Sequence, residues 1–237
     1  MDKILIFTPT YNESQNIEKF IKDVKSQSLD LDILIIDDNS PDNTQHIVKD
    51  LMKFDDTIKL IVRKKKSGID TAHKKAFNYA LENNYDYFIT MDSDLSHDPK
   101  EIRKFLEFSK KYDFVIGSRY MKGGGCGMKF YRYFLSKYGN LFIRYLLKIN
   151  LYEFTTSYRC FNLKKMKNFN IDEVSASGYS FFMETVYLIN LYKFKIKEIP
   201  IFFQDRKQGK SKISKIEILR TLYNLFLIKL NFKGNQL

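Results

Sequence analysis

The stretch Tyr87-Phe88-Ile89-Thr90-Met91-Asp92-Ser93-Asp94 joins an apolar run to two aspartates. This order is typical of a buried β-strand that ends at a polar site. Residues 4–7 and 33–36 are similar apolar runs, which end at Thr8-Pro9-Thr10 and at Asp37-Asp38. Further strands are predicted at 58–62 and 114–116, and helices at 14–26, 43–53, 70–83 and 99–110. Strands that alternate with helices predict an α/β fold with a Rossmann-like, mostly parallel twisted sheet flanked by helices.

Acidic residues follow two of these predicted strands, Asp37 and Asp38 after the second and Asp92 and Asp94 after the fourth. Ligands of parallel sheets bind beyond the carboxyl ends of the strands. In an extended strand, residues i and i+2 point to the same side, so Asp92 and Asp94 could together hold Mg²⁺ or Mn²⁺ on a diphosphate. One such carboxylate could simply cap the next helix. Two clusters at the same edge of the sheet favour a functional site.

Composition excludes several classes of protein. The chain has 237 residues, 44% of them apolar and 16% aromatic, which predicts a packed globule and excludes a mainly disordered chain. No apolar run approaches the ~20 residues of a membrane span. Cys126 and Cys160 fit neither a metal motif nor a disulfide framework, so we expect a reduced, cytoplasmic protein.

A formal charge of +12 would draw the protein to polyanions, such as nucleic acid, acidic lipid headgroups or phosphate-bearing substrates. Composition alone favours the alternative, a lysine-rich solvated surface. The sequence has no zinc-finger spacing and no aromatic RNA-binding signature, so nucleic acid is not an expected partner.

The second half of the chain contains a segment rich in aromatic, basic and apolar residues. Residues 129–149, if helical, place basic side chains near one face (Lys137, Arg144, Lys148) and apolar ones opposite (Leu135, Tyr138, Phe142, Leu146). This pattern predicts either a helix at a membrane surface or a helix packed on the domain with snorkelling lysines. We expect one domain over residues 1–214, followed by an apolar and basic helix over 215–237. That helix either docks on the core, meets a partner or embeds shallowly in a membrane.

Several ordered motifs resemble those of family 2 glycosyltransferases, which have the GT-A fold. The motifs are Thr8-Pro9-Thr10-Tyr11-Asn12-Glu13, Asp37-Asp38-Asn39-Ser40-Pro41-Asp42, Asp92-Ser93-Asp94-Leu95, Gly117-Ser118-Arg119-Tyr120, Thr156-Ser157-Tyr158-Arg159 and Arg206-Lys207-Gln208-Gly209-Lys210-Ser211-Lys212. The resemblance runs from residue 4 to about residue 214. Within the family, the sequence most resembles dolichol-phosphate or polyprenol-phosphate mannosyltransferases.

The resemblance implies a role for each matching residue. The nucleoside would contact Pro9, Tyr11, Glu13 and Asp38. The donor diphosphate and a divalent cation would contact Asp92, Ser93, Asp94 and Ser96, where Ser96 occupies a position that is often Gln in the family. Donor or acceptor phosphates would contact Arg119, Arg132, Ser136, Arg206 and Lys212. The acidic residue that often precedes the Thr-Ser motif is replaced by Phe154, with Glu153 beside it.

The implied activity is inverting transfer of mannose from GDP-mannose to a polyprenol phosphate, with Asp94, Arg119, Glu184 and Arg206 as catalytic residues. An anionic phosphate acceptor requires no strong base, whereas a sugar hydroxyl does. Glu184 is the candidate base, and its alternative role is an ion pair that positions an arginine. The expected place of action is the inner membrane face, with or without a membrane-anchoring subunit. Two alternatives remain: a UDP-sugar transferase acting on a glycan hydroxyl, and a non-catalytic basic module that binds polyanions.

Overall fold

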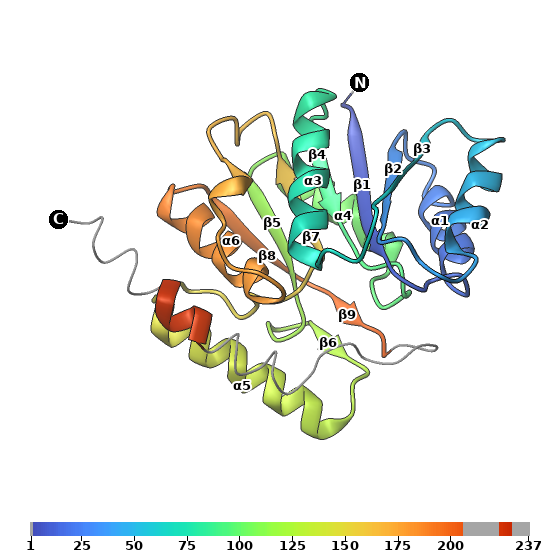
Figure 1. Ribbon diagram of the computed structural model, residues 1–237. Coiled ribbons are helices and arrows are strands. Elements are labelled where there is room, and N and C mark those ends of the chain that lie inside the picture. The colour runs from blue at the N-terminus through green and yellow to red at the C-terminus, as the bar shows by residue number, and fades with distance from the viewer. Residues whose placement is uncertain (1, 206–222, 229–237) are drawn as a thin grey trace.

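A seven-stranded sheet forms the centre of the computed structural model, which describes residues 2–205 and 223–228. The spatial order of the strands is β3-β2-β1-β4-β7-β5-β8 (Figure 1). The strands are β1 Ile4–Thr10, β2 Asp32–Asp37, β3 Ile58–Val62, β4 Tyr87–Thr90, β5 Phe114–Ser118, β7 Arg159–Asn162 and β8 Ile196–Pro200. All neighbouring pairs are parallel except those of β7, which lies antiparallel between β4 and β5.

Helices connect the strands. They are α1 Ile17–Lys25, α2 Thr44–Met52, α3 Ile69–Glu82, α4 Ile102–Ser109, α5 Phe130–Leu147 and α6 Ser180–Leu191, with short 3₁₀ helices at Pro99–Glu101 and Ile171–Glu173. A small parallel sheet pairs β6 (Gly125–Cys126) with β9 (Phe202–Phe203). The alternation of strands and helices up to residue 118 confirms the predicted α/β class.

The two faces of the sheet bury separate apolar cores, because successive side chains of a strand point to opposite faces. In β1, Leu5 and Phe7 join the core beneath α3 and α6, whereas Ile6 joins the core beneath α1, α2 and α4. Strands buried on both faces have continuous apolar sequences. The apolar runs 4–7 and 33–36 are therefore strands of the interior.

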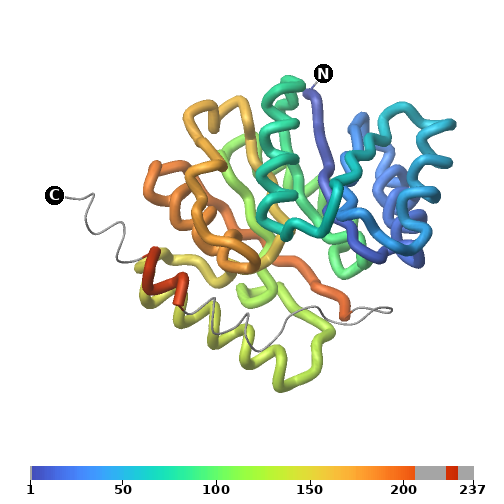
Figure 2. Tube along the Cα trace, viewed as in Figure 1, coloured from blue at the N-terminus to red at the C-terminus, as the bar shows by residue number. Residues whose placement is uncertain are grey.

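Strand β7 was not among the predicted strands, although the sheet depends on it. It crosses between β4 and β5 and pairs Arg159 with Thr90 on one side and with Ile116 on the other. A buried arginine at the start of the strand interrupts the apolar pattern that identifies the other strands. Figure 2 shows the result: the first part of the chain forms one side of the molecule and the second part the other.

In Figure 1, helix α5 lies below the sheet, beyond the lower ends of β5 and β8, and its Ile143 and Leu147 join the core beneath α3 and α6. The helical segment 223–228 buries Leu225 and Ile228 in the same core, and Asn224 donates to Ser180 Oγ at 3.0 Å. The boundary expected at residues 214 and 215 lies outside the described residues. No helix in the described ranges is long and apolar enough to cross a bilayer.

Candidate active site

Strand order brings the two acidic clusters together at the edge formed by the carboxyl ends of the parallel strands, here called the carboxyl edge. Strand β1 lies between β2, which precedes Asp38, and β4, which precedes Asp92. Adjacent strands lie ~4.8 Å apart, so the ends of β2 and β4 are about 10 Å apart with Pro9 between them. The topology therefore places the predicted nucleoside and diphosphate residues along one continuous edge.

Asp37 is a structural residue of this edge. Its fully buried carboxylate accepts from Thr10 Oγ1 at 2.7 Å, from Ser40 N at 2.8 Å, from Ser40 Oγ at 2.6 Å and from Gln45 Nε2 at 3.0 Å. These bonds compensate the burial of the charge. They also fix the turn after β2, which contains Asp38.

Asp38 is buried and forms an ion pair with Arg63, and it accepts from the Ser67 amide at 3.3 Å. Arg63 also donates to the Gly68 carbonyl at 2.9 Å. This pairing was not predicted from the sequence. In the sequence, Arg63 is only the first residue of a basic run. Its partner Asp38 lies 25 positions earlier, so no local pattern indicates the ion pair.

The predicted nucleoside residues after β1 lie in a loop that is tied to the turn after β2. Backbone amides of residues 12–14 donate to side chains of segment 40–44 at 2.9–3.0 Å. The ring of Tyr11 lies 4.3 Å from Lys66 Nζ, a cation–π contact. Glu13 accepts from Asn16 at 2.9 Å. These contacts place Tyr11 and Glu13 beside the loop that contacts Asp38.

The Asp92-Ser93-Asp94 segment forms a tight turn after β4. Asp92 Oδ1 accepts from Ser157 Oγ at 2.7 Å. Asp94 Oδ1 accepts from the Ser96 amide at 3.1 Å and also from the Ser96 hydroxyl. The hydroxyl of Ser96, expected as a third metal contact, thus points at a carboxylate of the pair. Ser93 and Asp94 are buried, whereas the side chain of Asp92 is 25% exposed.

His97 holds this turn through a hydrogen bond to its backbone. Its Nδ1 accepts from the Asp92 amide at 3.0 Å, and its ring stacks on Tyr158 at 4.8 Å. Burial lowers the pKa of His97, although the charges of Asp92 and Asp94 oppose the change. The imidazole is therefore neutral at pH 7, as an acceptor Nδ1 requires.

The chemistry of Asp92 and Asp94 fits a divalent cation. Mg²⁺ is usually held by one or two carboxylates together with substrate phosphates, not by an all-protein cage. Within residues 2–205 and 223–228, no group of three or more His, Cys, Asp or Glu side chains could hold a metal ion alone. Two hard oxygen ligands on one turn match a site that needs the donor diphosphate for completion.

Arg119 forms a buried bidentate ion pair with Glu153. Its Nε lies 2.7 Å from Glu153 Oε2 and its Nη2 lies 2.8 Å from Oε1, and Nη2 also donates to Thr155 Oγ1 at 3.1 Å. Burial by itself would raise the pKa of Glu153, but the charge and hydrogen bonds of Arg119 and those of Thr155 hold it below its usual range. Glu153, the neighbour of Phe154, is thus an ionised carboxylate at pH 7 that pairs with Arg119.

The middle of α5 is hydrogen bonded to the same region. Ser136 Oγ accepts from Tyr120 at 2.6 Å, and burial raises the pKa of Tyr120 to about 12. Asn140 accepts from the Phe154 amide at 2.7 Å. Arg132 lies one turn before Ser136 on the same helix face, because i and i+4 positions align. Ser136 is therefore bonded to the residue that follows Arg119, and Arg132 is one helical turn from Ser136.

Glu184 is buried at the start of α6. Its Oε1 accepts from Ser175 Oγ at 3.0 Å and its Oε2 from the Ala176 amide at 2.5 Å. In the described part of the chain it forms no ion pair with a basic residue, so its visible role is to hold the loop before α6. Arg206 and Lys212 lie outside the described residues, and their roles stay predictions.

Comparison with known proteins identifies the family. The family described as Glycosyl transferase family 2 matches residues 5–172, so the chain belongs to it. Polyprenol monophosphomannose synthase of Mycolicibacterium smegmatis is 30% identical over 226 residues, which cover 94% of this chain and 85% of that protein. Undecaprenyl-phosphate mannosyltransferase of Micrococcus luteus is 30% identical over 213 residues, covering 90% of this chain and 88% of that protein. The resemblance predicted from the motifs is confirmed.

Solved structures confirm the GT-A fold. Glucosyl-3-phosphoglycerate synthase from Mycobacterium tuberculosis, in complex with Mn²⁺, UDP and glucosyl-3-phosphoglycerate, has a TM-score of 0.67 at 12% identity, covering 94% of this chain and 80% of that one. The mannosyltransferase PcManGT from Pyrobaculum calidifontis, in complex with GDP-Man and Mn²⁺, has a TM-score of 0.58 at 16% identity, covering 88% and 58%. At these identities the likeness concerns the fold.

Replacing Glu153 with Gln should lower the free energy of unfolding by ~3–5 kcal/mol at pH 7, because Arg119 keeps its buried charge without a counter-ion. The pKa of Glu153 is lower in the folded protein than in the unfolded chain. Its contribution is therefore complete above the unfolded value of about 4.3 and is lost as the pH falls below it. Urea unfolding should show a smaller difference from wild type at pH 4 than at pH 7. A matched control is Asp50→Asn, which breaks an exposed pair with Lys53. Equal stability of both variants at pH 7 would contradict the assignment.

Proposed function

We propose that this glycosyltransferase moves mannose from GDP-mannose to a polyprenol phosphate, with inversion, at the inner membrane surface. The observation that supports it most is the arrangement along the carboxyl edge of Asp38, Asp92 and Asp94 beside the buried Arg119–Glu153 pair. The polyprenol monophosphomannose synthase and the undecaprenyl-phosphate mannosyltransferase described above are each 30% identical to this chain over at least 90% of its length. The carboxylates suit a donor diphosphate held through a cation, and the arginine suits a phosphate.

The donor would lie along the edge from Tyr11 to Asp94. Pro9, Tyr11 and Glu13 would line the nucleoside, with Asp38 and Arg63 at its side. Asp92 and Asp94 would hold the diphosphate through Mg²⁺ or Mn²⁺, which supplies positive charge as the leaving group becomes more anionic. Ser157 and Ser96 orient these two carboxylates through their hydroxyl hydrogen bonds.

The arginine would stabilise the transition state. An oxygen of the acceptor phosphate attacks the anomeric carbon, and the bond from that carbon to the donor diphosphate breaks. Glu153 engages Nε and Nη2 of Arg119, so the guanidinium would meet a phosphate through Nη1. A preorganised cation at the point where charge develops lowers the barrier more than it strengthens ground-state binding. Arg132 and Ser136 would extend the phosphate site along α5.

The acceptor decides the role of Glu184. A phosphate acceptor is already anionic at neutral pH, so proton removal is not required. The hydrogen bonds of Glu184 to Ser175 and Ala176 suit a residue that shapes the loop before α6. An acceptor hydroxyl, in the alternative UDP-sugar reaction, would need Glu184 as a base.

A panel of nucleotide sugars and acceptors tests the proposal. With Mn²⁺, the purified protein should transfer mannose from GDP-mannose to polyprenol phosphate, and Glu184→Gln should keep kcat within about threefold. Radiolabelled product in the lipid extract is the measurement. Transfer only from a UDP-sugar to a glycan, with a loss of over ~10³ in Glu184→Gln, would favour the alternative, since losses on that scale follow removal of an acid–base group.

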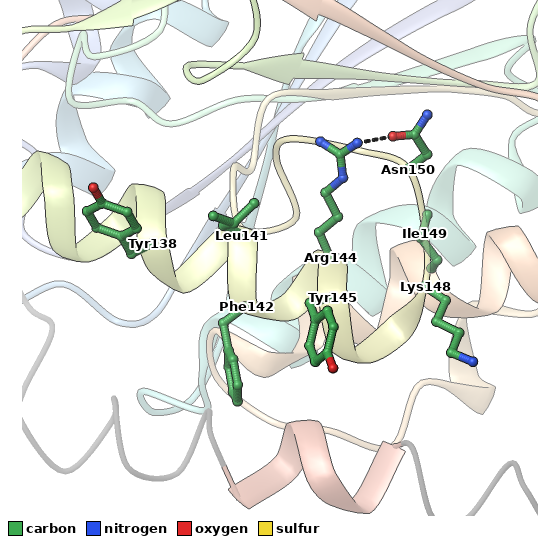
Figure 3. A pocket seen from close by; sticks show the side chains of 8 residues that line it. All are labelled: Tyr138, Leu141, Phe142, Arg144, Tyr145, Lys148, Ile149 and Asn150. Carbon is green, nitrogen blue, oxygen red and sulfur yellow. Dashed lines mark hydrogen bonds between the residues drawn. The ribbon is translucent and has the colours of Figure 1, made fainter.

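Membrane action is proposed from the outer face of α5. Seven large apolar or aromatic side chains of this helix are at least 40% exposed: Phe130, Tyr131, Leu135, Tyr138, Leu141, Phe142 and Tyr145. Tyr138, Leu141, Phe142 and Tyr145 line a surface groove of about 670 Å³, and Phe142 and Tyr145 project to the same side there (Figure 3). Arg144 and Lys148 line this groove. Exposed aromatics next to cations suit an interface with anionic lipid. A membrane-anchoring subunit would be an alternative occupant of the same face.

Sedimentation with vesicles that contain phosphatidylglycerol tests this surface. The double variant Leu141→Ser/Tyr145→Ser should bind at least about fivefold more weakly than wild type, because it removes apolar area from the interface. Phe54→Ser is the matched control, since Phe54 is 90% exposed after α2 and outside α5. Equal vesicle binding by the double variant and the control would contradict membrane contact through α5.

A further inference from the structure

Arg159 is a buried cation that the proposed reaction does not use. It begins β7 in the middle of the sheet and is 1% exposed. In residues 2–205 and 223–228 it forms no ion pair with a carboxylate; its hydrogen bonds go to backbone carbonyls. Burial lowers the pKa of Arg159 to about 9, so the group is charged at neutral pH. A buried charge without a counter-ion is unfavourable for stability unless hydrogen bonds compensate it.

The guanidinium of Arg159 crosslinks two segments. Its Nε donates to the Thr156 carbonyl at 2.8 Å, and its Nη2 donates to the carbonyls of Phe154 and Phe182, each at 2.8 Å. Residues 154 and 156 belong to the loop before β7, whereas Phe182 lies in the first turn of α6. The planar fork of an arginine can meet several carbonyls in fixed directions, which a lysine cannot do. Arg159 therefore fixes this loop against α6.

The same loop holds the site. Arg159 binds the carbonyls of residues 154 and 156 of this loop, and the residues on either side of them, 153, 155 and 157, contact the site. Glu153 pairs with Arg119, and Thr155 accepts from Arg119 at 3.1 Å. Ser157 donates to Asp92 at 2.7 Å. A single short loop thus touches both the arginine and the first carboxylate of the site, and Arg159 binds this loop from the side of the core.

We propose that Arg159 is a positioning residue. By holding the carbonyls of Phe154 and Thr156, it sets the separation of Arg119 from Asp92 and so the place where a phosphate is held between them. Arg159 itself touches no substrate. This inference rests on the proposed function for its kinetic consequence, but its effect on the loop can be measured without any substrate. Misplacement by ~1 Å from a distant substitution can lower a rate by ~10².

Kinetics of Arg159→Met and Arg159→Lys provide the first test. In both variants kcat should fall ~10²-fold at 25 °C, while the KM for the donor changes less than about threefold. Arg159→Lys retains the charge without the planar fork, so its kcat should exceed that of Arg159→Met by less than about tenfold. Tyr85→Phe is the matched control: like Arg159, Tyr85 is buried and hydrogen bonded, but its partner is the carboxylate of Asp32 at the opposite edge of the sheet. Its kcat should equal that of wild type even where its stability is lower.

A double-mutant cycle separates positioning from general destabilisation. Ser157→Ala alone should lower kcat about tenfold, but in the Arg159→Met background the further loss should be under about twofold, because the loop is already displaced. If Arg159 only stabilised the fold, the two losses would multiply, or kcat of Arg159→Met would stay within threefold of wild type well below its unfolding temperature. Either result would overturn the proposal.

Amide hydrogen exchange tests the loop independently of activity. Exchange at residues 153–157 should rise at least ~10-fold in Arg159→Lys, with unchanged exchange in α1. If wild type transfers no sugar to any acceptor of the panel, the proposed function fails, and hydrogen exchange still decides whether Arg159 holds the loop. Unchanged exchange at 153–157 in both Arg159 variants would contradict the inference.

Discussion

Burial of charge is the constraint on which this structure depends. Carboxylates at the carboxyl edge lie next to the apolar core, and each must be paired or hydrogen bonded to remain ionised there. Asp37 is satisfied by hydroxyl and amide donors, Asp38 by Arg63, and Glu153 by Arg119. These contacts join loops that are far apart in the sequence. The pairing of buried charges therefore determines the shape of the site as well as its stability.

The pairing also separates structural carboxylates from those suited to a ligand. Asp37 uses its oxygens on four hydrogen bonds and fixes a turn. Asp92, after β4, has a partly exposed side chain that accepts from Ser157, while His97 accepts from its backbone amide. The acidic residues that follow different strands at this edge are thus not equivalent. Only the folded structure shows that Asp37 belongs to the scaffold.

Local sequence patterns predicted much of the fold. The strand expected at 58–62 is β3, the helix expected at 70–83 is α3 at Ile69–Glu82, and the segment 129–149 contains α5. Periodicity failed at β7, because Arg159 interrupts the apolar run and its compensation comes from carbonyls of a loop and of α6. Likewise, the partners of Asp38 and Arg119 could not be predicted, since each pair joins residues 25 or 34 positions apart. Long-range charge pairing leaves no periodic signal.

If Asp92 and Asp94 bind the donor diphosphate through a divalent cation, Mn²⁺ should strengthen nucleotide binding through these two carboxylates. Calorimetric titration of wild type and Asp92→Asn with GDP-mannose, with and without Mn²⁺, measures this effect. We expect Mn²⁺ to tighten nucleotide binding by wild type at least ~10-fold, and Asp92→Asn to lose this increment while its thermal unfolding remains cooperative. An undiminished response to Mn²⁺ in Asp92→Asn would show that Asp92 does not hold the cation, as expected of a non-catalytic polyanion-binding module.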